Sequence, residues 1–145
     1  MIPRVYLDSS VLLRKLFHDP EAVSPWGHWE RCFTSRLAEV ECLRVLDRRR
    51  LGGALSDVEI AGLNQKFREL LDCLELVELS EDVIHRAAQS FPVQVGTLDA
   101  IHVSSAILVK EGLDIDLVFL THDVQQGLAA QAMGLKTQGF KIPRS

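Results

Sequence analysis

Short apolar runs alternate along the chain with longer stretches in which apolar residues recur every three or four positions. Runs of this short kind, bounded by turn residues, are typical of buried strands, whereas the longer periodic stretches are typical of helices. The pattern predicts four or five strands. We expect them at Val5–Asp8, Cys32–Ser35, Glu75–Leu79, Leu117–Thr121 and, as a possible last strand, Lys136–Phe140.

Helical segments separate these strands, and several of them have clear boundary signals. Ser56 and Glu59 have the spacing of a capping box, and Gly112 and Gly134 follow the ends of two periodic stretches. We expect helices at Ser9–His18, Arg36–Arg50, Ser56–Cys73, Ser80–Phe91, Thr97–Glu111 and Val124–Met133.

Alternation of strands and helices predicts an α/β fold with a central, mainly parallel sheet of about four or five strands. Right-handed crossovers place helices on both faces, which gives three layers. The 145 residues suit one domain over 1–145, and no repeat or linker divides them. Pro20, Pro25 and Gly27 predict a loop or broken helix over Asp19–Arg31.

Composition narrows the class of protein. The chain is 47% hydrophobic and 25% charged, as ordinary globular domains are. No apolar run approaches the roughly 18 residues that span a bilayer, and the start lacks a secretory signal, so we expect a cytoplasmic protein without a membrane segment. The cysteines, which are odd in number and have no metal-type spacing, predict reduced thiols. With a net charge of −4, any nucleic-acid binding needs a local basic patch.

Two of the expected strands end at an aspartate. Asp8 follows the first strand and Asp123 follows the fourth by a short turn, so both carboxylates should emerge at the ligand-binding edge of a parallel sheet. Asp99 lies in the first turn of the helix that starts near Thr97. Each acid alone has a structural explanation, because Asp8 and Asp123 could cap the following helices and Asp99 suits a helix dipole.

A fourth acid, Glu41, lies inside a helix. At roughly 100° per residue it falls on the arc between Leu37 and Val45, so it is flanked by apolar neighbours. It could simply pair with Arg44 or Arg48 on its own helix. An acid on an apolar face is nevertheless not expected to be only a solvated group.

The four acids together suggest more than four separate caps. Capping explains where each acid lies on its own element, but not why all four would converge on one edge of the sheet. Four carboxylates in one cleft repel one another, and a hard divalent cation with oxygen ligands typically resolves such repulsion. The cluster therefore predicts a metal site.

Four segments of the chain resemble the motifs of the PIN domain, in the order in which the family has them. They read "VYLDSSVLLR", "SRLAEVECLRVL", "TLDAIHVSSAILV" and "LVFLTHDVQQGLAAQAMGL", and they span nearly the whole chain. The most specific parts are Leu98–His102 and Thr121–Asp123. More narrowly, the segments resemble the VapC-like toxin ribonucleases of bacterial type II toxin–antitoxin pairs. Ser9 departs from the threonine that the family often has, and Asp19–Arg31 matches no motif.

The resemblance implies a Mg²⁺- or Mn²⁺-dependent endoribonuclease that forms homodimers and binds a cognate antitoxin protein. Its catalytic and metal-binding acids would be Asp8, Glu41, Asp99 and Asp123. In that interpretation Asp8 is the main ligand, Asp99 and Asp123 share the first metal, and Glu41 bears on a second metal or orients the attacking water. Apolar residues of the expected helix after Gly53 would be free for the dimer, and they are Val58, Ile60, Leu63 and Phe67.

The second motif contains two acids. The family's glutamate follows a valine and precedes an arginine by three residues, and Val40, Glu41 and Arg44 fit that frame. Glu41 is therefore the match, while Glu39 stays open as an alternative ligand.

Hydroxyls and histidines stand beside the acids. Ser10 and Thr121 could serve turns and caps, or could bond to a ligand carboxylate or the attacking water. His102, one turn after Asp99, is expected to pack or hydrogen bond near the site. His122 is expected to be a solvent-facing turn residue rather than a ligand, because an oxygen-rich site favours Mg²⁺ or Mn²⁺ over zinc.

Basic residues follow two of the acids along the chain. They could be solvated helix ends that suit the dipole, or they could form a phosphate track that leads RNA to the metal. The candidate RNA-binding residues are Arg14, Arg44, Arg48, Arg49 and Arg50.

Two other classes of function compete with a ribonuclease. A phosphoacceptor or phosphatase also uses an aspartate at a strand end, but Asp8–Val11 lacks the second aspartate of the D-x-D-x-T pattern. The other class is a catalytically silent PIN-fold protein that binds RNA or a partner. The presence of all four acids argues against it.

Overall fold

The computed structural model describes residues 3–143. Five strands are present in that part of the chain, and each coincides with an expected strand apart from one or two residues at its ends. They are β1 (Arg4–Leu7), β2 (Arg31–Ser35), β3 (Glu75–Val77), β4 (Val118–Leu120) and β5 (Lys136–Gln138).

Six helices separate and follow these strands within the same residues. The capping box predicted for the third helix is present, because Ser56 and Glu59 bond reciprocally across the first turn. The fourth helix is shorter than expected and ends at Ala87 rather than at Phe91. The helices are α1 (Ser9–Leu16), α2 (Arg36–Leu51), α3 (Asp57–Asp72), α4 (Glu81–Ala87), α5 (Thr97–Leu113) and α6 (Val124–Ala132).

The strands form one sheet in the order β3-β2-β1-β4-β5, and every pair in it is parallel. β1 is central, and Leu7 at its end is in register with Leu120 at the end of β4. The strand order reverses between β1 and β4. In open parallel sheets such a reversal leaves a crevice beyond the carboxyl ends of the two strands, where ligands bind.

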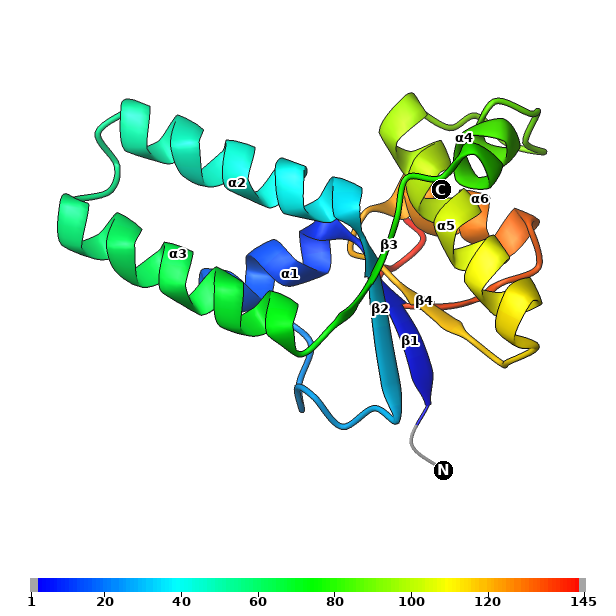
Figure 1. Ribbon diagram of the computed structural model, residues 1–145, viewed down its shortest axis with the longest axis horizontal. Helices are drawn as coiled ribbons and strands as arrows, with labels where there is room; N and C mark the ends of the chain where they lie inside the picture. Colours follow the sequence, from blue (N-terminus) through cyan, green and yellow to red (C-terminus); the bar gives the residue numbers. More distant parts are fainter. Residues whose placement is uncertain (1–2, 144–145) are drawn as a thin grey trace.

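Helices cover both faces of the sheet, as the three-layer prediction requires. Figure 1 shows α1, α2 and α3 on one side and α4, α5 and α6 on the other. The strand β1 serves both layers, because Val5 and Leu7 pack into one core while Tyr6 packs into the other. The fold is therefore the α/β class that the alternating pattern predicts.

The helices α2 and α3 lie side by side and extend beyond the sheet (Figure 1). The apolar side of α3 packs against the core beneath it, since Phe67 is 1% exposed and Ile60 and Leu63 contact the same cluster. The expectation that these side chains are free for a dimer is therefore wrong. Val58 alone of that set is largely exposed, at 84%.

The segment between α1 and β2 is a loop, as its prolines predict. Trp26 and Trp29 in this loop pack edge to face, with their ring centroids 5.1 Å apart. Both rings also contact the core on the α1 side of the sheet. This segment therefore helps to close the core at the amino edge of the sheet, opposite the carboxyl ends of the strands.

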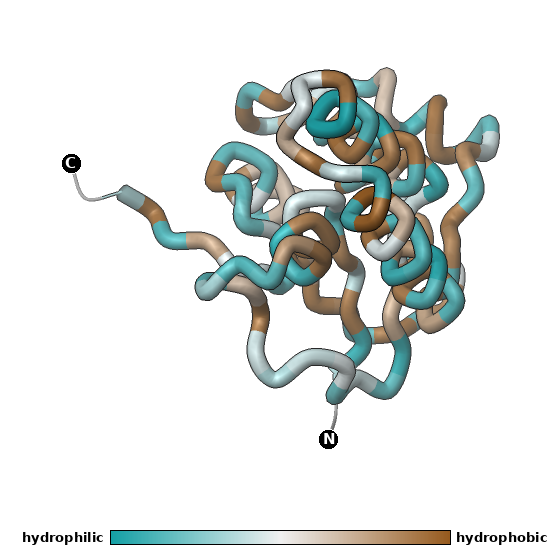
Figure 2. The backbone as a smooth tube through the Cα atoms, turned by 90° about the vertical axis from the view of Figure 1, so that its left-hand side faces the viewer, coloured by the Kyte–Doolittle hydropathy of each residue, from teal (hydrophilic) through white to brown (hydrophobic). Residues whose placement is uncertain are grey.

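The segment that follows β5 is fixed against the end of β4 at Gly139. Gly139 has φ +101°, and a Cβ atom there would lie 2.6 Å from the carbonyl oxygen of Thr121. The hydrogen bond from Thr121 N–H to Gln138 O joins the same two segments. Beyond this point the chain leaves the globular part of the molecule, as Figure 2 shows.

Two further properties concern the thiols and the apolar length of the helices. The three cysteines are free thiols, and burial raises the pKa values of Cys32 and Cys42 to about 12, so both stay protonated at neutral pH. Within residues 3–143, no helix combines the length and the apolar character that crossing a bilayer requires.

Candidate active site

Four acidic side chains gather beyond the carboxyl ends of β1 and β4. Asp8 directly follows β1 and accepts a hydrogen bond from Val11 N–H as the N-cap of α1. Asp123 is the N-cap of α6 and accepts from Gln126 N–H. Asp8 and Asp123 therefore both cap a helix. Their carboxylates still converge on one site, because both helices begin at the same edge of the sheet.

Asp8 is the most buried of the four acids, at 3% exposed. Ser10 donates a 2.6 Å hydrogen bond to its Oδ1, and Thr121 Oγ1 lies 2.8 Å from its Oδ2. Burial raises the pKa of Asp8, while the hydrogen bonds from Ser10 and Thr121 oppose that rise. The two predicted supporting hydroxyls therefore hold the Asp8 carboxylate from opposite sides.

Gln126 connects the other two aspartates with Thr121. Its side-chain amide donates to Asp99 Oδ1 at 3.1 Å, and its Oε1 lies 2.9 Å from Thr121 Oγ1. Its backbone N–H is the group that bonds to Asp123. The side chain is 1% exposed, so this buried amide ties Asp8, Asp99 and Asp123 into one network.

Asp99 lies in the first turn of α5 and carries the clearest electrostatic signature of the cluster. Burial, and after it the negative charge of Asp123, raise the pKa of Asp99 to about 6. Asp8 and Glu41 raise it further, while His102 opposes the shift. Asp99 therefore experiences the charges of all three other acids, as convergence on one site requires.

Glu41 reaches the site from α2 and contacts α5. Its Oε1 lies 2.6 Å from His102 Nε2, and Tyr6 Oη lies 2.8 Å from His102 Nδ1. His102 is 1% exposed, so the expectation that it hydrogen bonds near the site is confirmed. The alternative partners of Glu41 on its own helix are not used, because Arg44 pairs with Asp47 instead.

The other glutamate of the second motif lies outside this network. Glu39 forms an ion pair with Arg36 at 3.1 Å on the surface of α2. That pairing neutralises its charge at the helix surface and directs its carboxylate to a different partner from that of Glu41.

The ionic partners of the cluster differ from those of several acids on the surface. These surface glutamates and aspartates pair with arginine or lysine side chains. Among residues 3–143, no lysine or arginine forms an ion pair with Asp8, Glu41, Asp99 or Asp123. His102 is the only basic side chain in contact with any of them there.

The chemistry of this donor set fits a hard divalent cation. All four candidate ligands are carboxylates, which Mg²⁺ and Mn²⁺ prefer, and their mutual repulsion is the electrostatic condition that a cation relieves. In the arrangement described for residues 3–143, no three His, Cys, Asp or Glu side chains are already close enough together to hold a metal ion. The site thus has suitable donors without a closed ligand shell.

The candidate RNA-binding arginines are not part of the cluster. Most of them lie in the outer half of α2, where Arg50 pairs with Asp47 at 2.8 Å and the Arg49 guanidinium lies 3.8 Å from the centre of the Phe17 ring. Arg14 on α1 lies 3.7 Å from Glu21. The basic group is thus separate from the acids.

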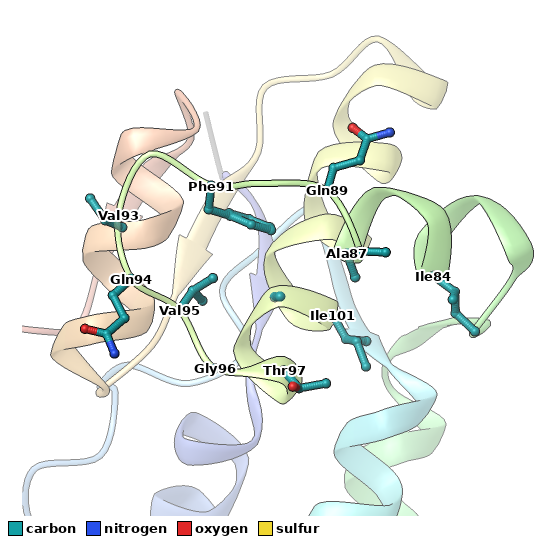
Figure 3. A pocket seen from close by; sticks show the side chains of 12 residues that line it. Ile84, Ala87, Gln89, Phe91, Val93, Gln94, Val95, Gly96, Thr97 and Ile101 are labelled. Carbon is teal, nitrogen blue, oxygen red and sulfur yellow. The ribbon is translucent and has the colours of Figure 1, made fainter.

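An open apolar cavity of about 620 Å³ borders the cluster between α4 and the start of α5. Figure 3 shows Phe91 and Val95 on the connecting loop, with Ile101 across from them on α5. Its lining carries none of the four acids, although Thr97 and Ala100 flank Asp99 in the chain. The cavity adds apolar surface beside the site but no ionisable group.

Two residues of the site are absent from the sequence prediction, and one expectation is met only in part. Tyr6 was missed because it lies inside an apolar strand, and Gln126 because its contacts depend on which elements meet at the edge of the sheet. His122 was expected to face solvent and is half-buried instead; its Nδ1 donates to Gly139 O at 2.7 Å, and its Nε2 is buried without a partner among the described residues. It fixes the C-terminal segment to the turn after β4.

Comparison with known proteins agrees with the fold and the motifs. Residues 5–126 match the model of the PIN domain family. Ribonuclease VapC47 of Mycobacterium tuberculosis (strain CDC 1551 / Oshkosh) is 32% identical over 126 residues, which cover 82% of this chain and 84% of that protein.

Solved structures with the same fold extend the comparison. VapBC2 from Rickettsia felis, bound to a DNA fragment from their promoter, matches with a TM-score of 0.64 and 11% identity, over 93% of this chain and 97% of that one. PAE2754 from Pyrobaculum aerophilum matches with a TM-score of 0.61 and 19% identity, over 94% and 90%. VapBC-1 from nontypeable Haemophilus influenzae matches with a TM-score of 0.55 and 14% identity, over 93% and 96%. By its domain match and its curated relative, the chain belongs to the PIN domain family.

Proposed function

We propose that this protein is a Mg²⁺- or Mn²⁺-dependent endoribonuclease and the toxin of a toxin–antitoxin pair. The observation that carries the proposal is the group of four carboxylates at the switch point of the sheet, to which no lysine or arginine of residues 3–143 is paired. Membership of the PIN domain family and 32% identity to a ribonuclease support it.

Asp8, Asp99, Asp123 and Glu41 are the residues that would hold the cation. A divalent cation held there would supply the Lewis acidity that activates a water for attack on the phosphodiester. Ser10 and Thr121 keep the Asp8 carboxylate in one orientation, and Gln126 does the same for Asp99. Because the amide and the hydroxyls already order these carboxylates, less conformational entropy is lost at the site when RNA binds.

The expected partners are RNA, a cognate antitoxin and a second copy of the chain. Two of the structural neighbours are VapBC proteins, which is consistent with an antitoxin partner here. RNA would contact the arginines of the outer half of α2 and Arg14, since the net charge of −4 gives no general attraction. We place the protein in the cytoplasm, where its free thiols stay reduced.

The alternative is a PIN-fold protein that binds RNA or a partner without cutting. Incubation of purified protein with a mixed RNA substrate and Mn²⁺ distinguishes the two functions. The proposal predicts cleavage by the wild type, no cleavage with EDTA, and no cleavage by Asp8→Asn or Asp99→Asn variants that remain folded.

Glu39→Gln is the matched control for this experiment, because Glu39 pairs with Arg36 outside the cluster. It should cleave as the wild type does. Cleavage that survives in both aspartate variants would show that the four acids are wrongly assigned, and binding without any cleavage by the wild type would favour the silent alternative.

A further inference from the structure

Three side chains from three different elements form a buried hydrogen-bonded chain that ends at Glu41. Tyr6 from β1 lies 2.8 Å from His102 Nδ1, and His102 from α5 lies 2.6 Å through Nε2 from Glu41 Oε1 on α2. Tyr6 is 0% and His102 1% exposed, so water does not compete for these bonds. The chain links the centre of the sheet to the half-buried carboxylate of Glu41.

The direction of the hydrogen bonds follows from the groups at the two ends. A carboxylate only accepts, so His102 Nε2 carries the proton that faces Glu41. In a neutral imidazole the other nitrogen is then an acceptor, and Tyr6 Oη–H donates to it. Glu41 thereby selects the tautomer, and the tyrosine hydroxyl stabilises it by donating to Nδ1.

The rings have little freedom to turn. The Tyr6 ring stacks on Phe119 with ring centroids 5.3 Å apart and meets the His102 ring edge to face at 5.9 Å. Both Tyr6 and Phe119 belong to neighbouring strands of the sheet. The position of the imidazole is therefore set by the most rigid part of the fold.

Glu41 depends on one side chain for its orientation, whereas Asp8 is held by several groups. Asp8 accepts hydrogen bonds from a backbone N–H and from hydroxyls, and Asp123 accepts from a backbone N–H. Within residues 3–143, His102 is the only hydrogen-bonding partner of the Glu41 carboxylate. A glutamate side chain also has more rotatable bonds than an aspartate side chain, so it gains more from one fixed donor.

We propose that Tyr6 and His102 are positioning residues, which hold the Glu41 carboxylate in the orientation that RNA cleavage requires. This inference rests on the proposed function of the acidic cluster. Neither ring is exposed to RNA, so both act through Glu41. Loss of the pair should lower kcat and leave KM for RNA nearly unchanged.

Three variants test the proposal through steady-state cleavage at one pH. His102→Leu removes the donor to Glu41 and should lower kcat on the order of 10- to 100-fold, as loss of a partner behind a ligand typically does. His102→Gln keeps an amide N–H as many bonds from Cβ as Nε2 and should recover most of that loss. Tyr6→Phe should lower kcat on the order of tenfold.

Ser104→Ala is the matched control. Ser104 lies two residues from His102 on α5, and its buried hydroxyl has no hydrogen-bond partner among the described residues. Removing it perturbs the same buried helix without touching the hydrogen-bonded chain, so kcat should be that of the wild type. Thermal melting of each variant shows which of them are folded.

A second readout does not depend on activity. Two-dimensional ¹H–¹⁵N spectra of the histidine rings, recorded without metal, should show the Nε2-protonated tautomer of His102 in the wild type. Tyr6→Phe should keep this tautomer, because Glu41 still accepts from Nε2, but should shift the Nδ1 resonance, because no donor then faces Nδ1. An Nδ1 resonance that stays where it is in the wild type would show that Tyr6 does not donate to His102.

The outcomes separate this inference from the function on which it rests. If Asp8→Asn abolishes cleavage while His102→Leu and Tyr6→Phe keep the kcat of the wild type, the positioning role is wrong and the ribonuclease proposal stands. If the wild type cleaves no RNA, the proposed function fails, and the histidine spectra still decide whether Tyr6 donates to His102. A fully Nδ1-protonated His102 in the wild type would overturn the inference. Should His102→Leu not fold, Tyr6→Phe and His102→Gln decide on kcat.

Discussion

At the scale of single residues, the charge of Asp99 determines how the acidic cluster responds to pH. Its pKa in the folded protein is about 6, raised first by burial and then by repulsion from Asp123, whereas an aspartate in an unfolded chain has a pKa of about 3.9. Between these two values the folded state binds more protons than the unfolded state. Stability therefore falls as the pH rises from about 4 to 6, and the loss persists above pH 6.

Asp99→Asn should remove this loss of folding stability at neutral pH. Without metal, we expect the variant to unfold at higher urea concentration than the wild type at pH 7.5, by on the order of 2 kcal/mol, and to lose most of this advantage at pH 4.5. Asp72→Asn, at an exposed position at the end of α3, is the control and should have the same small effect at both pH values. A variant that is less stable than the wild type at pH 7.5 would contradict the repulsion account.

A bound cation should favour the ionised form of Asp99, which burial and repulsion disfavour. Since a bound cation favours the ionised carboxylate, Mn²⁺ should raise the melting temperature of the wild type at pH 7.5 and should do so much less below pH 6. Differential scanning fluorimetry across this range measures the effect. An equal increase for wild type and Asp8→Asn would place the bound cation elsewhere.

The residue scale also explains how much of the site the sequence predicts. Asp8 and Asp123 are predictable because a strand end fixes where the next side chain emerges, whatever the rest of the chain does. Gln126 and Tyr6 are not, because their roles depend on which elements meet across the sheet. A polar residue that lies 3 positions after a helix cap, as Gln126 does after Asp123, is a local signal that could have suggested a link.

At the scale of secondary-structure elements, packing determines two features that the periodic hydrophobic pattern does not predict, namely which way a helix faces and where it ends. The pattern places α3 correctly, but it cannot say whether its apolar side faces the core or a partner, and Phe67 shows that it faces the core. The pattern also extends the fourth helix to Phe91, whereas α4 ends at Ala87 and the loop after it lines the cavity beside the site. Such ends depend on tertiary contacts rather than on local sequence.

The join between β4 and the C-terminal segment should be sensitive to a single methyl group. In Gly139→Ala, the added Cβ meets the Thr121 carbonyl at 2.6 Å, and the backbone has φ +101°, which non-glycine residues rarely adopt. We expect a loss of roughly 1–3 kcal/mol in chemical denaturation and slower cleavage, because Thr121 supports Asp8.

Gly62→Ala is the control for Gly139→Ala. Gly62 lies within α3, and an added Cβ there has no atom within 4 Å. The substitution should stabilise the protein by up to about 1 kcal/mol through helix propensity, without changing cleavage. If Gly139→Ala is as stable as the wild type, the C-terminal segment does not constrain the site.

At the scale of the whole molecule, positive and negative charge are separated. The acids lie at the carboxyl edge of the sheet, and Arg48, Arg49 and Arg50 lie in the last turn of α2. At about 1.5 Å per residue, the helix places these arginines roughly 10–14 Å from Glu41, a reach of about two nucleotides. This arrangement allows an acidic protein to hold phosphates near its acidic site.

Replacement of all three arginines by alanine should weaken RNA binding across sequences. The slope of log K against log salt should fall by up to about one unit for each phosphate that the variant no longer neutralises, and Mn²⁺ affinity should not change. Alanine at Arg4, Lys110 and Lys136 is the charge-matched control, because Arg4 and Lys136 begin strands at the opposite edge of the sheet and Lys110 lies near the end of α5. An unchanged slope would mean that the α2 arginines do not contact phosphate.

A homodimer should bury apolar side chains that the single chain exposes beside the site. Ile84 borders the apolar cavity and Leu98 precedes Asp99, and they are 55% and 49% exposed. We expect light scattering at micromolar concentration to give a dimer, which Ile84→Asp or Leu98→Asp weakens. Leu113→Asp, at the far end of α5, is the control, and a monomeric wild type would contradict the prediction.

The most direct test of the central claim is to locate the cation. Crystals grown with Mn²⁺ allow an anomalous difference map at the manganese absorption edge, which identifies the ion independently of any activity. The account predicts a peak bound by Asp8 together with Asp99 or Asp123, and no such peak in crystals of Asp8→Asn. A manganese peak away from these carboxylates, or an equal peak in the variant, would contradict it.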